Sequence, residues 1–367
     1  MTFDIAIVGA GMAGASLAAE VAGRASVLLL EAEDHPGYHS TGRSAAFWSE
    51  SYGGPLIQPL TQASGAFLAA PPEDFADSPF LSPRGALHIA DAAGEIALDA
   101  LASDFADSNV RLDPVGRAAL ECAIPGLRPG WDRGLSEPSC ADIDVARLHG
   151  AYLKRARARR AELVTGARLQ GAERSGGSWR LDTSAGTFDA NLLVDAAGAW
   201  ADQVAELAGE RPLGIRPYRR TLVQLRIDPP VPADLPLVID ARQLFYFKPE
   251  SGGRLWLSPH DETACDPCDS APEEYDIALA IDRLESAVDW RVERVERAWA
   301  GLRSFAPDRL PVYGFSATNR GFFWCAGQGG FGIQTAPAAA KMAAAMLLGS
   351  EAESAIDPGP YRANRFG

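Results

Sequence analysis

The sequence predicts an α/β protein with a second domain of the α+β class, and three observations predict it. First, the opening residues contain an apolar strand, a glycine-rich turn, a helix and a second apolar strand that ends at Glu31. Second, further strand-and-helix units follow, one with a strand from Ala190 and a helix from Ala201 and one near the end of the chain. Third, strands of alternating polarity, separated by proline-rich turns, occupy residues 212–299, which is typical of an antiparallel sheet.

The first turn contains the spacing Gly9-x-Gly11-x-x-Gly14 between a strand and a helix. In this setting the first glycine makes a tight turn, the second lets a pyrophosphate approach the backbone, and the third lets helix and strand pack closely. The helix N-terminus offers N–H groups to the phosphates. Glu31 can accept hydrogen bonds from a ribose diol, which argues against NADP. A glycine-rich turn without a ligand is the alternative, and the complete strand–helix–strand context argues against it.

The middle of the chain is expected to alternate between helices, strands and a polar connection. Residues 37–47 are too polar for a core and too rich in small residues for a chance loop. Helices are expected at 55–70, at 93–125 with loops, and from about 142–144 to Ala161; strands are expected at 87–89, 162–165, 179–182, 187–189, 190–195, 220–227, 244–247 and 254–257.

The C-terminal unit decides between two dinucleotides. A strand from Gly321 leads into a second glycine loop and then a helix, with Thr335 as its expected cap, Pro337 in its first turn and Gly349 at its end. A site for NAD is completed within one contiguous domain, whereas this second loop lies far along the chain from the first. A flavin needs such an element, because a helix N-terminus stabilises negative charge on the reduced ring. The layout therefore favours FAD over NAD.

Composition excludes several classes of partner. The chain has 367 residues, 34 of them basic and 48 acidic, so the net charge of −14 disfavours nucleic acid or an anionic membrane as partner. No stretch reaches ~18 uninterrupted apolar residues, so no membrane span is expected. The nucleotide strand begins at once, so we expect no cleaved signal peptide. Five irregularly spaced cysteines predict a reducing, cytoplasmic setting. Cys265 and Cys268 form a lone CxxC, for which an exposed loop is favoured over zinc or redox chemistry.

The chain resembles the D-amino-acid oxidase/glycine oxidase superfamily of FAD-dependent enzymes, and within it most closely the D-arginine dehydrogenase type of D-amino-acid dehydrogenase. The resemblance covers nearly the whole chain. It rests on residues 8–16, 36–46, 141–144, 195–200, 219–220, 245–246, 299–305 and 328–335.

The resemblance implies a discontinuous architecture with non-covalently bound FAD. A Rossmann-like FAD-binding domain would comprise residues 1–82, 140–211 and 300–367, and an antiparallel-sheet substrate-binding domain residues 83–139 and 212–299. No metal site is expected. The residues implied to bind the cofactor are Gly9, Gly11, Ala13, Gly14, Glu31, Ala32, Ser40, Thr41, Gly42, Arg43, Ser44, Ala45, Ala46, Phe47, Arg168 (through its backbone), Gly329, Gly330, Phe331, Gly332, Ile333 and Gln334.

The resemblance also implies which residues face the substrate: Tyr52, Arg220, Tyr246, Arg303 and the backbone of Gly330. Arg303 stands in an apolar run, where a buried guanidinium needs an anion. A substrate carboxylate would suit it, and a structural pair with a protein acid is the alternative. Arg219 and Arg220 are neighbours on a predicted strand, so they are expected to face opposite sides. The same alternation directs Tyr246 away from its two flanking phenylalanines, into the site or into core packing.

Two positions depart from the resembling enzymes. Where arginine-using relatives carry an acid after a Ser-Pro-Arg-x segment, this chain has Ala86. A carboxylate for a cationic side chain is therefore missing there, which favours a substrate with a neutral or apolar side chain. Where a histidine is expected beside the flavin, this chain has Phe47.

The expected activity is FAD-dependent oxidative deamination of an amino acid, D-configured and with a neutral or apolar side chain. Hydride transfer from Cα to flavin N5 would lead to the 2-oxo acid and ammonia. The alternatives are a secondary-amine oxidase of the glycine/sarcosine type, an FAD-dependent 2-hydroxy-acid dehydrogenase with His88 as base or as a merely structural residue, and a flavin-bearing subunit with little turnover. The expected partner is a small carboxylate substrate, and the electron acceptor stays open among a quinone, a dye and oxygen.

Overall fold

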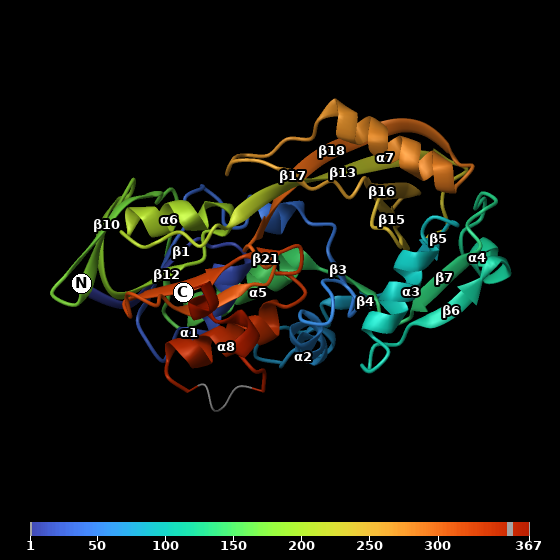
Figure 1. The fold of residues 1–367 in the computed structure, drawn as a ribbon. Coiled ribbons are helices and arrows are strands. Elements are labelled where there is room, and N and C mark those ends of the chain that lie inside the picture. Colours follow the sequence, from blue (N-terminus) through green and yellow to red (C-terminus); the bar gives the residue numbers. More distant parts are fainter. Residues whose placement is uncertain (1, 351–354, 367) are drawn as a thin grey trace.

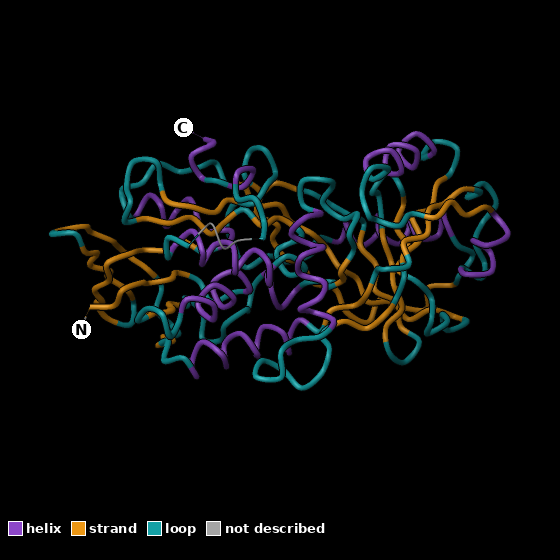
Figure 2. Tube along the Cα trace, turned by 90° about the horizontal axis from the view of Figure 1, so that it is seen from below, coloured by secondary structure: helices purple, strands orange, loops and turns teal. Residues whose placement is uncertain are grey.

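The chain folds into two lobes that lie side by side. The computed structural model describes residues 2–350 and 355–366. Figure 1 shows both ends of the chain in the same lobe, and the second view in Figure 2 shows strands at the centre of each lobe. The two longest strands, β13 (Arg216–Asp228) and β18 (Arg291–Phe305), run from one lobe into the other.

The first lobe is built on a sheet with a parallel centre. Strands β2, β1, β12 and β20 lie next to one another and run parallel, β9 adds a further parallel strand, and β10, β11 and β19 pair antiparallel at the margins. The bounds are β1 Thr2–Val8, β2 Val27–Leu30, β9 Glu162–Val164, β10 Leu169–Ser175, β11 Ser178–Thr183, β12 Gly186–Asp195, β19 Val312–Phe315 and β20 Phe322–Ala326.

Alternation along these strands divides the core of this lobe between the two faces of the sheet. Ile5 and Ile7 of β1 pack with helices on one face, whereas Ala6 and Val8 pack with a helix and the marginal strands on the other. The helices of the first face are α1 (Met12–Val21), α2 (Gln58–Ala69), α5 (Val145–Ala158) and α8 (Ala336–Leu347); the helix of the second face is α6 (Ala201–Leu207). The α/β class expected from the sequence is confirmed.

The second lobe holds a twisted, mostly antiparallel sheet. Its order is β21-β18-β13-β16-β15-β14-β5-β7-β6, and β17 pairs with β13. The bounds are β5 Ala86–Ala90, β6 Asp113–Gly116, β7 Arg133–Glu137, β14 Leu237–Asp240, β15 Tyr246–Glu250, β16 Arg254–Ser258, β17 Thr263–Ala264 and β21 Gln328–Gly329. The expectation of a purely antiparallel sheet is wrong at one place, because β14 and β5 pair in parallel.

The two faces of this sheet have different neighbours. One face carries Phe245 and Phe247 and packs against α7 (Glu274–Ala287), which the sequence analysis did not anticipate although Ala280 and Leu284 repeat at helical spacing. Figure 1 shows α7 on the outer side of β13 and β18. The opposite face carries Leu222 and Tyr246 and is turned toward the first lobe.

Two short helices and a small sheet complete the second lobe and its border with the first. Residues 93–125 contain α3 (Glu95–Asp104) and α4 (Arg117–Ala123), but β6 separates them, so the expected helical stretch includes an unforeseen strand. The strands β3 (Phe47–Trp48), β8 (Ala141–Ile143) and β4 (Leu81–Pro83) form a separate sheet.

The ends of two helices correct the sequence analysis. Asp142 lies in β8, not in a helix, and α5 starts only after Asp144, whose side chain accepts a hydrogen bond from the Arg147 N–H at 3.0 Å. Thr335 precedes α8 but does not cap it, because its hydroxyl bonds to the Phe331 carbonyl. Pro337 lies in the first turn of α8, and Gly349 follows its last turn with φ +72°, both as expected.

The division into an FAD-binding domain and a substrate-binding domain, with its boundaries, stays a prediction. Among the described residues, none of the helices is both long and apolar enough to cross a membrane.

We predict that Asp144→Ala destabilises the protein through α5. The Asp144 carboxylate satisfies a first-turn N–H, and loss of such a cap lowers the free energy of unfolding by about 1 kcal/mol. The measurement is the urea midpoint of unfolding. Asp144→Asn keeps an acceptor and serves as the control, so equal midpoints for the alanine variant and the wild type would contradict the assignment.

Candidate functional site: a cofactor cavity that ends at two arginines

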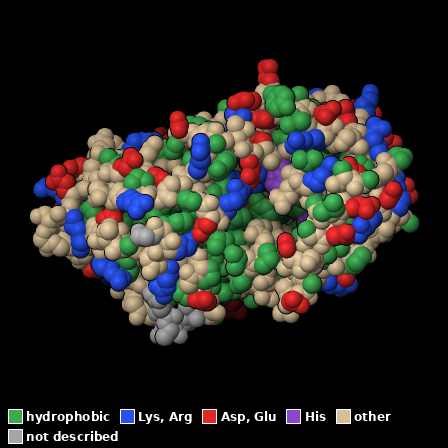
Figure 3. All heavy atoms as spheres, in the orientation of Figure 1, with side chains coloured by type: hydrophobic (Ala, Val, Ile, Leu, Met, Phe, Trp, Pro, Cys, Tyr) green, Lys and Arg blue, Asp and Glu red, His purple; other side chains and the backbone are tan. Residues whose placement is uncertain are grey.

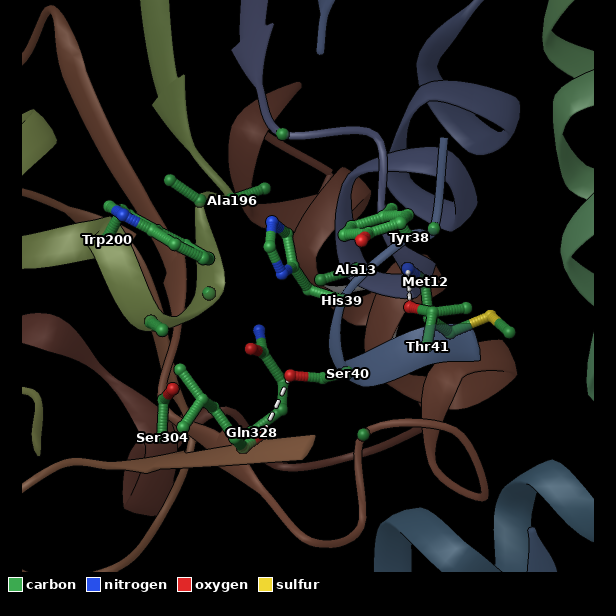
Figure 4. A pocket seen from close by; sticks show the side chains of 18 of the residues that line it. Met12, Ala13, Tyr38, His39, Ser40, Thr41, Ala196, Trp200, Ser304 and Gln328 are labelled. Atoms are coloured by element: carbon green, nitrogen blue, oxygen red, sulfur yellow. Dashed lines mark hydrogen bonds between the residues drawn. The ribbon is translucent and has the colours of Figure 1, made fainter. Parts of the chain in front are cut away.

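A single cavity extends from the carboxyl ends of the parallel strands toward β13 and β18. At one end it is lined by Leu30, Glu31 and Arg168, and at the other by Arg220 and Arg303. Figure 4 shows its middle, where side chains from the 38–41 segment face those of Trp200, Ser304 and Gln328. In the space-filling view, hydrophobic side chains gather on the face where the two lobes meet (Figure 3). The cavity therefore connects the nucleotide lobe with the sheet of the second lobe.

The glycine turn at the cavity wall is close-packed against backbone at two of its glycines and meets only one side-chain atom at the third. Gly9 has φ +99°, and a Cβ there would overlap the Ala196 carbonyl. A Cβ on Gly14 would overlap the Gly9 carbonyl. At Gly11 the nearest atom to an added Cβ is the Thr41 hydroxyl oxygen, at 3.3 Å. Gly9 and Gly14 thus serve the turn and the packing, and Gly11 leaves space beside the helix N-terminus for a ligand.

Glu31 and Arg168 lie at the strand end of the cavity. Glu31 is buried, and its two carboxylate oxygens accept hydrogen bonds from the N–H groups of Ala10, at 2.9 Å, and Glu33, at 3.0 Å. Each oxygen keeps a further lone pair for a ribose hydroxyl. The Arg168 N–H donates to the Ser184 hydroxyl, and its carbonyl accepts from the Ser184 N–H. A backbone contact from Arg168 to adenine would therefore use the second lone pair of its carbonyl.

The polar segment after the second strand folds over the cavity as a short 3₁₀ helix (η1, Ser40–Arg43). The Ser40 hydroxyl donates to the Leu302 carbonyl of β18 at 2.6 Å, and the Thr41 hydroxyl accepts from the first N–H of α1, that of Met12, at 3.0 Å (Figure 4). Arg43 donates to the Ser270 and Ala300 carbonyls and pairs with Asp269. The segment is thus bonded to both lobes.

Most of the expected cofactor residues line this cavity, and the others lie outside its lining. The lining includes Gly9, Gly11, Ala13, Glu31, Ala32, Ser40, Thr41, Arg43, Ser44, Ala45, Arg168, Gly329, Gly330, Gly332 and Ile333. Outside the lining are Gly14, Gly42, Ala46, Phe47, Phe331 and Gln334.

The expected residues outside the lining support the site indirectly. Gly42 N–H bonds to the Gly37 carbonyl, and Ala46, which has φ +45°, lines a second hollow with Lys248 on the far side of the segment. Phe47 and Phe331 each pack edge-on against Tyr52.

Sequence reasoning missed several residues of the cavity wall. The rings of His39 and Trp200 lie 4.6 Å apart between centroids, and His39 Nε2 lies 3.1 Å from the Glu33 carboxylate. Figure 4 shows both rings beside the cavity. The sequence signal for Trp200 is the run of small residues after β12. Residues 195–200 carry part of the resemblance, but they are not among the residues expected to bind the cofactor. Also missed were Met12, Tyr38, Ala196, Ala197, Gly198, Ala199, Leu302 and Gln328.

At the far end, Arg303 is held next to Tyr52 and Gly330. The Arg303 Nη1 donates to the Tyr52 phenol oxygen at 2.7 Å. A Cβ on Gly330 would overlap that phenol oxygen and lie 3.1 Å from the same guanidinium nitrogen. Among the described residues, no carboxylate lies within ion-pair distance of Arg303, so the structural pair considered from the sequence is not found. Burial by itself lowers the pKa of Arg303, but the neighbouring phenols and acids, Tyr52 first among them, raise it above its ordinary value.

Arg220 and Arg219 face opposite sides of β13, as the alternation predicts. Arg219 is directed to α7, where it pairs with Asp276 at 2.9 Å. Arg220 is 3% exposed, lines the cavity and donates to the Asp261 carbonyl at 2.6 Å and to Glu262 at 3.1 Å. Its Nη1 is buried without a hydrogen-bond partner among the described residues. Burial and the charge of Arg303 lower the pKa of Arg220 to about 10.

Tyr246 lies on the face of β15 opposite to its phenylalanine neighbours. Its ring contacts the edge of Phe47, and it interacts electrostatically with Arg220 and Arg303. Its phenol oxygen is buried and has no hydrogen-bond partner in the described part of the chain. The side chain is therefore packed in the core through its ring and carries an unused polar group near both arginines.

Ala86 and His88 belong to a buried part of the same sheet. Ala86 is enclosed with Leu237 and Ile239, and its cross-strand neighbour on β7 is Glu137. His88 Nε2 lies 3.2 Å from the Glu137 carboxylate and does not line the cavity. Of the two roles considered for His88, the structure favours the structural one.

The residues present fit an FAD molecule. The helix N-terminus beside Gly11 suits a pyrophosphate, and the cavity continues from there to Gly329, Gly330 and Arg220, while the buried phenol of Tyr246 lies outside the cavity lining. A nicotinamide dinucleotide site inside one lobe would not include β18, so the length of the cavity agrees with the flavin expected from the sequence.

Comparison with known proteins agrees with this geometry. The family model described as "DAO: FAD dependent oxidoreductase" matches residues 4–346. Hydrogen cyanide synthase subunit HcnC of Pseudomonas aeruginosa is 27% identical over 227 residues, which are 61% of this chain and 52% of that protein. Glycine oxidase of Geobacillus kaustophilus is 30% identical over 193 residues, 50% of this chain and 47% of that protein. The chain thus spans about half the length of these curated relatives.

Solved structures show the same fold over almost the whole chain. The crystal structure of glycine oxidase from Geobacillus kaustophilus has a TM-score of 0.86 at 23% identity and covers 98% of each chain. That of L-proline dehydrogenase from P. horikoshii has a TM-score of 0.83 at 18% identity, covering 96% of this chain and 95% of the other. The expected superfamily is confirmed by these findings, and the closer likeness to D-arginine dehydrogenases stays a prediction.

We predict that Gly11→Ala removes the cofactor without unfolding the protein. The backbone at Gly11 has φ −69° and ψ −171°, which alanine adopts, but a Cβ would occupy the space for the pyrophosphate. We expect the FAD content per purified chain to fall at least about tenfold while the melting temperature of the apoprotein is unchanged. Gly150→Ala, at an open position of α5, is the control. Full FAD content in the Gly11 variant would refute the placement of the pyrophosphate.

Proposed function

Because the chain belongs to the DAO family of FAD-dependent oxidoreductases, we propose that it oxidises the Cα–N bond of an amino acid. The product imine is then hydrolysed by water to the 2-oxo acid and ammonia. The substrate is a D-amino acid with a neutral or apolar side chain.

One observation supports a carboxylate substrate above the others: the cavity ends at two guanidiniums, and donors in and next to its lining lack partners among the described residues. Arg303 has no ion-pair partner among the described residues, and Arg220 Nη1 and the Tyr246 phenol lack hydrogen-bond partners there. An unsatisfied buried donor costs about 1–3 kcal/mol, and more when it is charged. A carboxylate would satisfy these donors together and would neutralise part of the charge of two adjacent guanidiniums.

The residues around the clamp orient the substrate. Tyr52 uses its oxygen to accept from Arg303, which leaves its own O–H free to donate to a carboxylate. Gly330 lies against this pair, so its backbone limits how deep the substrate can enter. Fixing the carboxylate at one end presents Cα to the cofactor in one orientation, and such positioning is a large part of catalysis in a reaction of this kind.

FAD would be held by the glycine turn, Glu31, the η1 segment and the loop at residues 329–333, and when bound it supplies the acceptor for the hydride that leaves Cα. The chain contributes the orientation of the substrate and the exclusion of water. If the amine enters in its neutral form, no side chain has to act as a base.

The surroundings of Ala86 support a neutral side chain. Leu237 and Ile239 enclose Ala86, and the carboxylate across the strand from it, that of Glu137, is already bonded within the protein. The Glu137 carboxylate is therefore not free to bind a cationic substrate tail at this position. A 2-hydroxy-acid dehydrogenase would need a base, and His88 is the candidate for it. Because His88 is bonded to Glu137 and lies outside the cavity lining, its position does not support that alternative.

The test is anaerobic reduction of the bound flavin by a panel of compounds. We expect neutral and apolar D-amino acids to bleach the visible flavin absorbance faster than D-arginine or D-lysine. Their L-enantiomers, N-methyl amino acids and 2-hydroxy acids are the comparison compounds. Bleaching by 2-hydroxy acids alone would overturn the proposed reaction, faster bleaching by L-enantiomers would overturn the stereochemistry, and no bleaching by any compound would favour a subunit without turnover.

Two neighbouring arginines provide a matched pair of variants for the clamp. We predict that Arg220→Ala lowers kcat/KM per bound flavin at least about 100-fold, because it removes a buried charged donor to the carboxylate. Arg219→Ala, whose side chain faces α7, is expected to lower it less than about threefold. Steady-state kinetics on FAD-loaded protein measures both. Similar losses in the two variants would show that Arg220 has no particular role at the substrate.

A further inference from the structure

Glu137 at the end of β7 is fully buried and binds a short segment of the other lobe. Its exposed fraction is 0%. One carboxylate oxygen accepts from the N–H groups of Glu50, at 2.7 Å, and Ser51, at 3.4 Å. The other accepts from the hydroxyls of Ser51, at 2.6 Å, and Ser49, at 3.0 Å, and lies 3.2 Å from His88 Nε2.

The segment that Glu137 binds leads directly into Tyr52. On its opposite side the same segment is held by Gln334, whose side-chain oxygen accepts from the Ser49 N–H at 3.2 Å and whose amide donates to the Tyr52 carbonyl at 3.2 Å. The Gln334 amide also donates to the Thr61 hydroxyl of α2 at 2.9 Å. The backbone before Tyr52 is therefore fixed between β7 of the second lobe and α2 and the 328–335 loop of the first.

The carboxylate of Glu137 is kept in its charged form by these bonds. Burial raises the pKa of Glu137, but the hydrogen bonds from His88, Ser51 and Ser49 more than offset this, so the pKa lies below its ordinary value. An ionised carboxylate can only accept hydrogen bonds, and the N–H and O–H groups of residues 49–51 and His88 that contact it are all donors to it. The arrangement has one stable geometry, which is what a residue that orients a neighbouring segment requires.

We propose that Glu137 is a positioning residue that fixes Tyr52 against Arg303 and thereby sets the affinity of the site for a carboxylate. The inference rests on the proposed function in that it takes Tyr52 to touch the substrate. Glu137 itself does not line the cavity, and its action passes through residues 49–51.

Two other roles for Glu137 give different expectations. A carboxylate that only stabilised the fold would affect the amount of folded protein and leave the contribution of Tyr52 to binding unchanged. A carboxylate that bound a cationic substrate tail would affect basic substrates alone. A positioning role instead makes the effects of Glu137 and Tyr52 on the binding of a simple carboxylate non-additive.

The experiment is a double-mutant cycle on the holoenzyme with benzoate as the probe. Its Kd is measured from the perturbation of the flavin spectrum, which does not depend on turnover. We expect Tyr52→Phe and Glu137→Gln each to raise the Kd about tenfold. In the Glu137→Gln protein, the further change Tyr52→Phe is expected to raise the Kd less than about twofold. If the two effects were independent, this further change would raise it about tenfold, and the double variant would bind about 100-fold more weakly than the wild type.

The matched control is Glu210→Gln. Glu210 is also a buried carboxylate that binds a segment, since it accepts from the Ser316 hydroxyl at 2.6 Å and from the Asn319 amide at 2.7 Å, but that segment does not adjoin Tyr52. In the Glu210→Gln protein, Tyr52→Phe should keep its full tenfold effect. If Glu137→Gln protein does not fold, Ser51→Ala takes its place in the cycle. It removes the 2.6 Å bond to Glu137 together with the longer contacts of the same hydroxyl to Ser49, at 3.3 Å, and His88, at 3.4 Å.

The outcomes separate the inference from the function on which it rests. A tenfold effect of Tyr52→Phe in both the wild-type and the Glu137→Gln protein overturns the positioning role and leaves the substrate site intact. If Tyr52→Phe does not change the Kd in the wild-type protein, Tyr52 does not contact the carboxylate. This result would overturn both its assignment to the substrate site and its positioning by Glu137.

Discussion

The guanidiniums of Arg220 and Arg303 face one cavity and set the main electrostatic constraint on this molecule, because no carboxylate among the described residues lies within ion-pair distance of Arg303. Desolvating a guanidinium costs several kcal/mol unless an anion or enough acceptors compensate for it. The protein compensates only in part, through Glu262 and the Asp261 carbonyl on Arg220 and through the phenol of Tyr52 on Arg303. The compensation that is missing has the charge and the forked geometry of a carboxylate, so the site is shaped electrostatically before any ligand enters.

The long pair of strands β13 and β18 carries this constraint from one lobe to the other. Their register places Arg220 opposite Gly301 and Tyr218 opposite Arg303, which brings both guanidiniums to the same end of the cavity. β18 also pairs with β21, so that Ser304 lies opposite Gly329. The glycine loop that lines the cavity beside Arg303 is therefore bonded to the same strand that carries this arginine. A shift of this strand would move cofactor and substrate contacts together.

Much of the fold could be predicted from the sequence because its signals are local. The glycine spacing at residues 9–14, the alternation that separates Arg219 from Arg220, and the residues around the ends of α8 are all read within a few positions. Thr335 shows the limit of such reading, since its hydroxyl had a carbonyl one turn back as a competing partner. The contacts of Glu137 with residues 49–51 and of His39 with Trp200 depend on tertiary packing, which spacing along the chain does not reveal.

The position of β20 in the sheet of the first lobe has a consequence for biosynthesis. β12 ends at Asp195, and its parallel neighbour β20 begins only at Phe322, after the strands β13–β18 and the helix α7 have been made. During vectorial synthesis residues 193–195 of β12 therefore stay unpaired on that side until most of the second lobe has left the ribosome, whereas residues 186–190 can already pair with β11. An open strand edge is a template for wrong pairing. The sheet of the first lobe is consequently completed last, although its first strand is made first.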